Sequence, residues 1–149
     1  MRRAVITGIG IISSIGDNKD EVLNSLKAGL SGISFAEEYA DMGCRSHVYG
    51  LPKVNLDDIL DRKLRRFMGD GAAYNYLAMV EAIRDSGLLV EEVSHERTGL
   101  IMGSGGPSTR NLIQAADAAR EKGPRKIGPF MVPRTMSSTN SATLATPFK

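Results

Sequence analysis

Two short apolar runs, each followed by glycines, constrain the fold of this chain more than any other feature. Residues 4–7 precede Gly8 and Gly10, and residues 98–102 precede a glycine-rich stretch at 103–106. Runs of this length are typical of buried strands, and the segments between them have helical periodicity. Because parallel strands need crossover helices between them, the order β, α, α, β, α predicts a parallel sheet covered by helices.

The glycines after the first run resemble those of a nucleotide-binding turn in number but not in spacing. Such a turn needs a third glycine three residues after the second; Ser13 occupies that place, and Gly16 comes too late. The acidic residue that should follow about 20 positions later, after a second strand, is also missing. We therefore expect Gly8, Gly10 and Gly16 to provide positive φ angles or close packing of chain on chain.

Helical patterns account for most of the remaining chain. The sequence predicts irregular surface chain over 30–53 and helices over 17–28, 55–60, 66–86, 108–122 and 132–146. Gly29 and Gly87 follow two of these helices, at the position where a left-handed cap is common. Pro133 suits the first turn of the last helix, and Pro147 is expected to stop it.

The length of the chain limits how complete this fold is. The 149 residues suffice for one domain, but only two strands are predicted, and an isolated parallel pair leaves its edges unpaired. We therefore expect residues 1–149 to form one incomplete domain that begins a longer protein.

Composition argues against several other classes of protein. A net charge of +2 at pH 7 with few aromatic residues gives no support for a nucleic-acid partner. No apolar run approaches the roughly 18 to 20 residues of a membrane-spanning helix, so we expect no membrane role and a cytoplasmic location. The single cysteine, Cys44, permits neither an internal disulfide nor a zinc cage.

No group of residues has a pattern typical of catalysis. Cys44 and His47 lie three positions apart in the expected loop without a third orienting group, and His95 lies in a polar turn. The adjacent acids Asp57 and Asp58 at a helix start are explained by the helix dipole. We therefore expect no catalytic residue, no metal ligands and no cofactor in this chain.

Basic residues gather in two places. Arg62, Lys63 and Arg66 share one face of a helical turn, and Arg125 and Lys126 lie in a loop between helices. These clusters are either solvated surface or a docking site for an acidic partner or a phosphate, and the sequence pattern leaves both interpretations open.

Several blocks occur in one order along the whole chain: RRAVITGIGIISSIG, RSHVYG, DRKLRRFMGDGAAYNYLAM, RTGLIMGSGG, GPRKIGPFMVPRTM and LATPFK. In these blocks the chain resembles the N-terminal part of the β-ketoacyl-acyl carrier protein synthases, the elongating condensing enzymes of bacterial fatty acid synthesis. RSHVYG, DRKLRRFM and LATPF are more similar to synthase I than to synthase II.

The resemblance implies an α/β thiolase-like fold. This chain would form part of the N-terminal half of a five-layered α/β/α/β/α core, as the N-terminal portion of a ketosynthase that is usually a homodimer. The implied activity is that of an acyltransferase, which elongates fatty acids by decarboxylative Claisen condensation of an acyl-enzyme thioester with malonyl-carrier protein. In this family the nucleophilic cysteine and the catalytic histidines lie beyond position 149, so this chain alone is expected to be inactive.

The resemblance also implies supporting roles for residues within the chain. Arg62, Lys63 and Arg66 match family residues that contact the acidic acyl carrier protein. Arg125 and Lys126 match a second such patch, which the other subunit contributes.

Two further positions match residues that border the acyl pocket. Met136 would reach across the dimer interface, and Gly106 would admit an acyl chain that a larger side chain would obstruct. Pro107 and Thr143 depart from the family pattern, with Thr143 in place of a cysteine that is not the nucleophile. An alternative from another class is a noncatalytic module that binds the carrier protein or dimerises.

Overall fold

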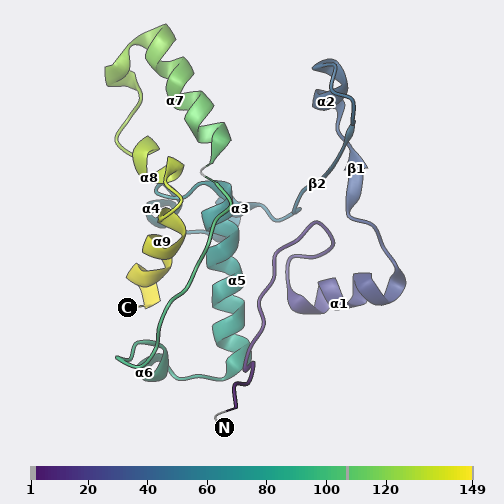
Figure 1. Cartoon of the computed structure of the whole chain (residues 1–149), viewed down its shortest axis with the longest axis vertical. Coiled ribbons are helices and arrows are strands. Elements are labelled where there is room, and N and C mark those ends of the chain that lie inside the picture. Colours follow the sequence, from purple (N-terminus) through teal and green to yellow (C-terminus); the bar gives the residue numbers. More distant parts are fainter. Residues whose placement is uncertain (1–2, 107, 149) are drawn as a thin grey trace.

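The computed structural model describes residues 3–106 and 108–148, whose longest helix, of 17 residues, lies in the middle of the molecule. The elements are α1 (Lys19–Ala28), β1 (Ile33–Phe35), α2 (Glu37–Asp41), β2 (Val48–Gly50), α3 (Leu56–Ile59), α4 (Arg62–Arg65), α5 (Asp70–Ser86), α6 (Val90–Val93), α7 (Thr109–Lys122), the 3-10 helix η1 (Pro124–Lys126), α8 (Met131–Thr135) and α9 (Thr139–Phe148). Figure 1 shows α9 beside α5, and β1 and β2 in an arm on the other side of the molecule.

The two glycine caps that the sequence predicted are present at the ends of α1 and α5, and the structure adds a side-chain cap at the start of α1. Asn18 accepts a hydrogen bond from the backbone N–H of Glu21 (3.0 Å), and Gly29 ends α1 with a φ of 62°. Gly87 ends α5 in the same left-handed conformation, with a φ of 69°. Ser108 precedes α7 as expected, but its side chain accepts no backbone N–H of the helix, and its hydroxyl donates to the Asn111 side chain at 3.1 Å.

Two predicted helices differ in the structure: the one over 66–86 begins only at Asp70, and the last one is divided. Residues 62–65 form α4, which is separate from α5 because the chain turns at Gly69; a Cβ there would lie 2.8 Å from the Ser108 Cβ. The last predicted helix is interrupted by an extended Met136, which separates α8 from α9. Pro147 does not stop α9 but lies in its last turn.

The two predicted strands, and with them the predicted parallel sheet, are not formed in the described residues. Residues 4–7 and 98–102 are extended but unpaired, and Ile6 and Ile101 are 85% and 97% exposed. A strand requires a hydrogen-bonded neighbour, and the described chain supplies none to either run. The prediction of two paired strands is therefore wrong for the described residues.

A small sheet occurs where irregular chain was expected. β1 and β2 pair in antiparallel fashion, with Ile33 opposite Gly50 and Phe35 opposite Val48. The segment that joins them contains α2, and the N–H of Ala36 donates to the His47 carbonyl at 2.7 Å. Strands of three residues contain too little alternation to be recognised from sequence.

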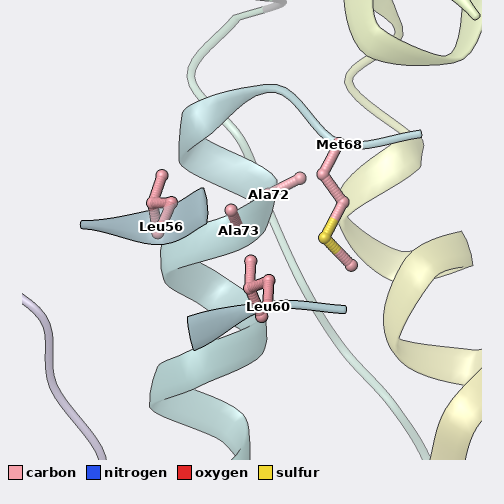
Figure 2. Packing of buried hydrophobic residues seen from close by; sticks show 5 residues of the cluster. All are labelled: Leu56, Leu60, Met68, Ala72 and Ala73. Carbon is pink, nitrogen blue, oxygen red and sulfur yellow. The ribbon is translucent and has the colours of Figure 1, made fainter. Parts of the chain in front are cut away.

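The main apolar cluster lies where α3 and the residues before α5 meet the first turns of α5. Figure 2 shows its members, Leu56, Leu60, Met68, Ala72 and Ala73. Met68 is completely buried, which is worth about 1.5–3 kcal/mol by transfer from water. This cluster fixes α4 against the start of α5, and α4 contains the basic residues singled out from the sequence.

Candidate functional site

The first basic cluster lies on α4 and at its end. Arg62, Lys63 and Arg66 are exposed, and in the described part of the chain none of them forms an ion pair with an acidic side chain. Asp61 is adjacent, but its carboxylate caps α4 and accepts the backbone N–H of Lys63 at 2.8 Å. We call Arg62, Lys63 and Arg66 the α4 basic surface.

Arg65 belongs to the same run of sequence but is not part of this surface. Its guanidinium donates to Asp57 (3.1 Å), to Asp70 (2.6 Å) and to the carbonyl of Met68 (2.6 Å). These contacts fasten α4 to α3 and to the start of α5. The charge of Arg65 is therefore neutralised within the fold, whereas the charges of the α4 basic surface are not.

The adjacent acids at the start of α3 have structural contacts. Asp57 accepts from Arg65, and Asp58 accepts from the Asn55 side chain at 2.7 Å. Both acids lie in the first turn of the helix, where the dipole favours negative charge.

The second basic cluster lies apart from the first in this chain. Arg125 and Lys126 are exposed in η1, which follows a turn at Gly123 with a φ of 86°. Figure 1 shows this turn at the end of α7 that points away from α5, at a distance from α4. The single chain therefore presents two separate basic patches.

Gly106 and Met136, which were singled out as neighbours of an acyl chain, line the same pocket of about 120 Å³. Gly106 ends the extended segment before α7, and Met136 lies between α8 and α9 with half of its surface exposed. A Cβ added to Gly106 would meet nothing within 4 Å, so the backbone there leaves open space beside this glycine. The fold therefore brings together two residues that are distant in sequence.

Of the two residues that depart from the family pattern, Thr143 and Pro107, the structure describes only Thr143. The Thr143 hydroxyl is buried on α9 and donates to the Thr139 carbonyl at 2.6 Å, so its polar group is satisfied within the helix. Pro107 lies outside the described residues.

The sequence analysis missed a pair of carboxylates on α5 that hold the N-terminal segment. Glu81 is buried and accepts the backbone N–H of Ile11 (2.9 Å) and of Lys19 (2.8 Å). Asp85 accepts the N–H of Ile9 at 3.0 Å and the ammonium of Lys19. The hydrogen bond from Lys19 lowers the pKa of Asp85 most, and the hydrogen bond from the Ile9 N–H lowers it further. The same contact with Asp85 raises the pKa of Lys19.

The spacing of Glu81 and Asp85 along α5 explains why they accept alternate N–H groups of the N-terminal segment. Residues four apart on a helix are displaced by about 6 Å along its axis, and alternate residues of an extended chain by about 6.8 Å. Two acids one turn apart therefore reach alternate N–H groups of an extended segment. The available signal was an acid, Glu81, within the otherwise apolar run from Leu77 to Ile83.

The other residues with reactive side chains contact the backbone. The Nε2 of His47 lies 2.7 Å from the carbonyl oxygen of Cys44, and the Nδ1 of His95 accepts the N–H of Arg97 at 3.1 Å. Over residues 3–106 and 108–148, no three His, Cys, Asp or Glu side chains are grouped so that they could hold a metal ion. Within the same ranges, no helix combines the length and apolar character needed to cross a membrane.

Comparison of the sequence with known proteins gives matches over its whole length. The family model described as the N-terminal domain of beta-ketoacyl synthase matches residues 1–149. The 3-oxoacyl-(acyl-carrier-protein) synthase 1 of Haemophilus influenzae is 57% identical over 150 residues, which cover 100% of this chain and 37% of that protein. The chain thus spans little more than a third of the curated relatives it matches.

Solved structures have the same backbone path. A beta-ketoacyl synthase from Burkholderia phymatum matches 99% of this chain and 37% of its own with a TM-score of 0.81 and 26% identity. A ketosynthase in complex with its type II polyketide acyl-carrier protein matches 97% of this chain and 38% of its own with a TM-score of 0.73 and 16% identity. These similarities confirm the expected thiolase-like fold class, as part of its N-terminal half.

Proposed function

Because the chain belongs to the β-ketoacyl synthase family, we propose that it is the N-terminal segment of a 3-oxoacyl-(acyl-carrier-protein) synthase I. The full-length protein elongates fatty acids by decarboxylative Claisen condensation. The 57% identity over the whole chain is the observation that carries this proposal.

The proposed reaction has two stages. A cysteine thiolate of the full-length protein attacks the acyl thioester, and the thiolate of the carrier protein leaves. Malonyl-carrier protein then loses CO₂, and its carbanion attacks the enzyme-bound thioester, which releases the cysteine. We assign neither Cys44 nor a histidine of this chain to these steps, so the 149-residue chain alone is inactive.

The α4 basic surface is the proposed docking site for acyl carrier protein, loaded with either the acyl or the malonyl group. Its three cations are exposed and without acidic partners among the described residues, which suits an acidic protein by charge complementarity. The presence of a carrier protein in one of the related solved complexes supports the same kind of partner. A soluble carrier also accords with a cytoplasmic location.

The second basic patch completes this site from the partner subunit of a homodimer. Its separation from α4 within one chain supports this assignment, because one chain does not present both patches side by side. Mixing subunits that carry Arg125→Glu and Lys126→Glu with subunits altered at α4 tests it. Restored carrier binding is expected at one of the two sites of each mixed dimer, and no restoration would contradict the shared site.

In this proposal Gly106 borders the acyl chain of its own subunit, and Met136, with half of its surface exposed, reaches the acyl pocket across the dimer interface. In the full-length protein, Gly106→Phe should shift the products to shorter acyl chains, because the added ring occupies space that is open in the native chain. An unchanged product distribution would contradict this role.

The proposal is tested by a condensation assay on the full-length protein and on the 149-residue chain, with acyl- and malonyl-carrier protein as substrates. Activity is expected only from the full-length protein. A full-length protein that binds the carrier and does not condense would favour the noncatalytic module, and activity of the short chain would contradict the absence of a nucleophile from it.

A further inference from the structure

Arg66 differs from the other cations of the α4 basic surface because its guanidinium lies against two aromatic rings. The Arg66 Cζ is 5.0 Å from the ring centroid of Phe67 and 5.0 Å from that of Phe130. The two rings are perpendicular, with centroids 5.1 Å apart. The guanidinium carbon and the two centroids therefore form a nearly equilateral triangle, and both rings lie within cation–π range of the charge.

The two rings come from different parts of the chain. Phe67 follows Arg66 directly, whereas Phe130 lies immediately before α8. One turn into α8, the Nε of Arg134 donates to the carbonyl of Arg66 at 2.9 Å. The start of α8 thus contacts both the side chain and the backbone of this one residue of the basic surface.

These contacts fix Arg66 without neutralising it. Its neighbour Arg65 forms ion pairs with the carboxylates of Asp57 and Asp70, so the charge of Arg65 is already paired within the fold. An aromatic ring supplies no formal charge, so Arg66 keeps its positive charge while its freedom is reduced. A long side chain that is ordered before binding loses less entropy when a partner arrives.

We propose that Phe130 is a positioning residue for carrier docking, which holds the guanidinium of Arg66 where an acidic partner meets the α4 basic surface. The inference rests on the proposed docking function of that surface. Phe130 is half-buried and acts through Arg66, not by contact with the carrier.

The competing explanation is that Phe130 only packs α8 against α4. The two explanations differ in how Phe130 depends on Arg66. Simple packing predicts the same effect of Phe130 with or without the guanidinium, whereas positioning predicts that the effect on binding disappears when the guanidinium is absent.

A double-mutant cycle in the full-length protein separates them. Phe130→Leu retains an apolar side chain and removes the ring, Phe130→Tyr retains the ring, and Arg66→Ala removes the cation. The measurement is the Kd for acyl carrier protein at low salt, together with kcat and KM for acyl-carrier protein.

For Phe130→Leu we expect a roughly two- to fivefold weaker Kd, the range given by exposed cation–π contacts, with KM raised and kcat retained. Phe130→Tyr should restore native binding. In the Arg66→Ala background, Phe130→Leu should cause no further loss, because the group that it positions is already absent.

Equal losses in the two backgrounds, or a loss that Tyr does not restore, would overturn the positioning role. If Arg66→Ala weakens binding and Phe130→Leu does not, this inference fails and the proposed docking surface stands. If Arg66→Ala itself leaves the Kd unchanged, the docking surface fails and the inference fails with it.

Discussion

The buried carboxylate of Glu81 accepts the backbone N–H of Ile11 at 2.9 Å, across 70 positions of sequence. Its other oxygen accepts the N–H of Lys19, the first residue of α1, at 2.8 Å. One side chain of α5 therefore fixes both the extended N-terminal segment and the start of the helix that follows it. The negative charge also lies at the N-terminus of α1, where the helix dipole favours it.

Glu81→Leu should destabilise the protein by about 2 kcal/mol, because it leaves two backbone donors without their acceptor. Glu81→Gln retains one acceptor oxygen and should cost about half as much. Urea unfolding measures both changes. Glu91→Gln, on the exposed surface of α6, is the matched control and should change stability by less than about 0.5 kcal/mol. Equal stability of the native protein and Glu81→Leu would show that the anchoring is dispensable.

Gly10 should be nearly intolerant of substitution. An added Cβ would overlap the carbonyl oxygen of Ala78 and lie 2.7 Å from the backbone N of Ala82, so the N-terminal segment would have to move off α5. Gly10→Ala should cost about 1–3 kcal/mol by overpacking. Gly71→Ala, in the first turn of α5 with nothing within 4 Å of an added Cβ, should instead stabilise slightly, by up to about 0.5 kcal/mol. Urea midpoints that move in the same direction for both variants would contradict this difference.

The glycines illustrate what the sequence could establish. The spacing of Gly8 and Gly10 argued against a nucleotide-binding turn and left two roles open for these glycines, positive φ or close packing. The structure selects close packing: neither residue has a positive φ, and both lie against the backbone of α5. Which backbone they approach was not readable, because α5 is about 70 residues distant.

Elsewhere, too, features that depend on neighbouring residues could be predicted, and features that depend on distant parts of the chain could not. Gly29 and Gly87 could be identified as helix caps because a cap depends on a few neighbouring residues. The pairing of residues 4–7 and 98–102 depends on neighbours outside the local sequence, and prediction failed there. Helical spacing could place Arg66 and not Arg65 on the basic face, but it could not show that Arg65 pairs with Asp70 or that Arg66 lies against Phe130.

Acid should weaken the attachment of the N-terminal segment through Asp85. Its pKa in the folded protein is lowered by Lys19 and by the Ile9 N–H, relative to an ordinary value of 3.8. The unfolded chain therefore takes up a proton first, so the stabilisation is present above that ordinary value and is lost as the pH falls through the folded pKa. The unfolding free energy of the native protein should decrease in this window.

Asp85→Asn should reduce the slope of this acid dependence. Glu21, whose pKa is lowered by the Asp17 N–H and then by Asn18, contributes a slope of the same sign and should remain in the variant. Urea unfolding at several acidic pH values gives the two slopes. Identical slopes for the native protein and Asp85→Asn would mean that this carboxylate does not contribute.

Reversal of two charges on the α4 basic surface should weaken the binding of acyl carrier protein. In the full-length protein, Lys63→Glu with Arg66→Glu replaces attraction by repulsion, with a loss on the order of tenfold at low salt. The loss should diminish as salt is added, because exposed charges are screened over about 10 Å at 0.1 M. Titration calorimetry at several salt concentrations measures it.

The matched control for this charge reversal is Lys27→Glu on α1. Lys27 is exposed, and Figure 1 shows α1 on the side of α5 opposite to α8 and α9. A long-range effect of net charge would weaken binding in the control as well, whereas a local docking site predicts a change only for the α4 pair. Unchanged affinity of the α4 pair at low salt would exclude this surface as the docking site, and the two cations would then be solvated surface.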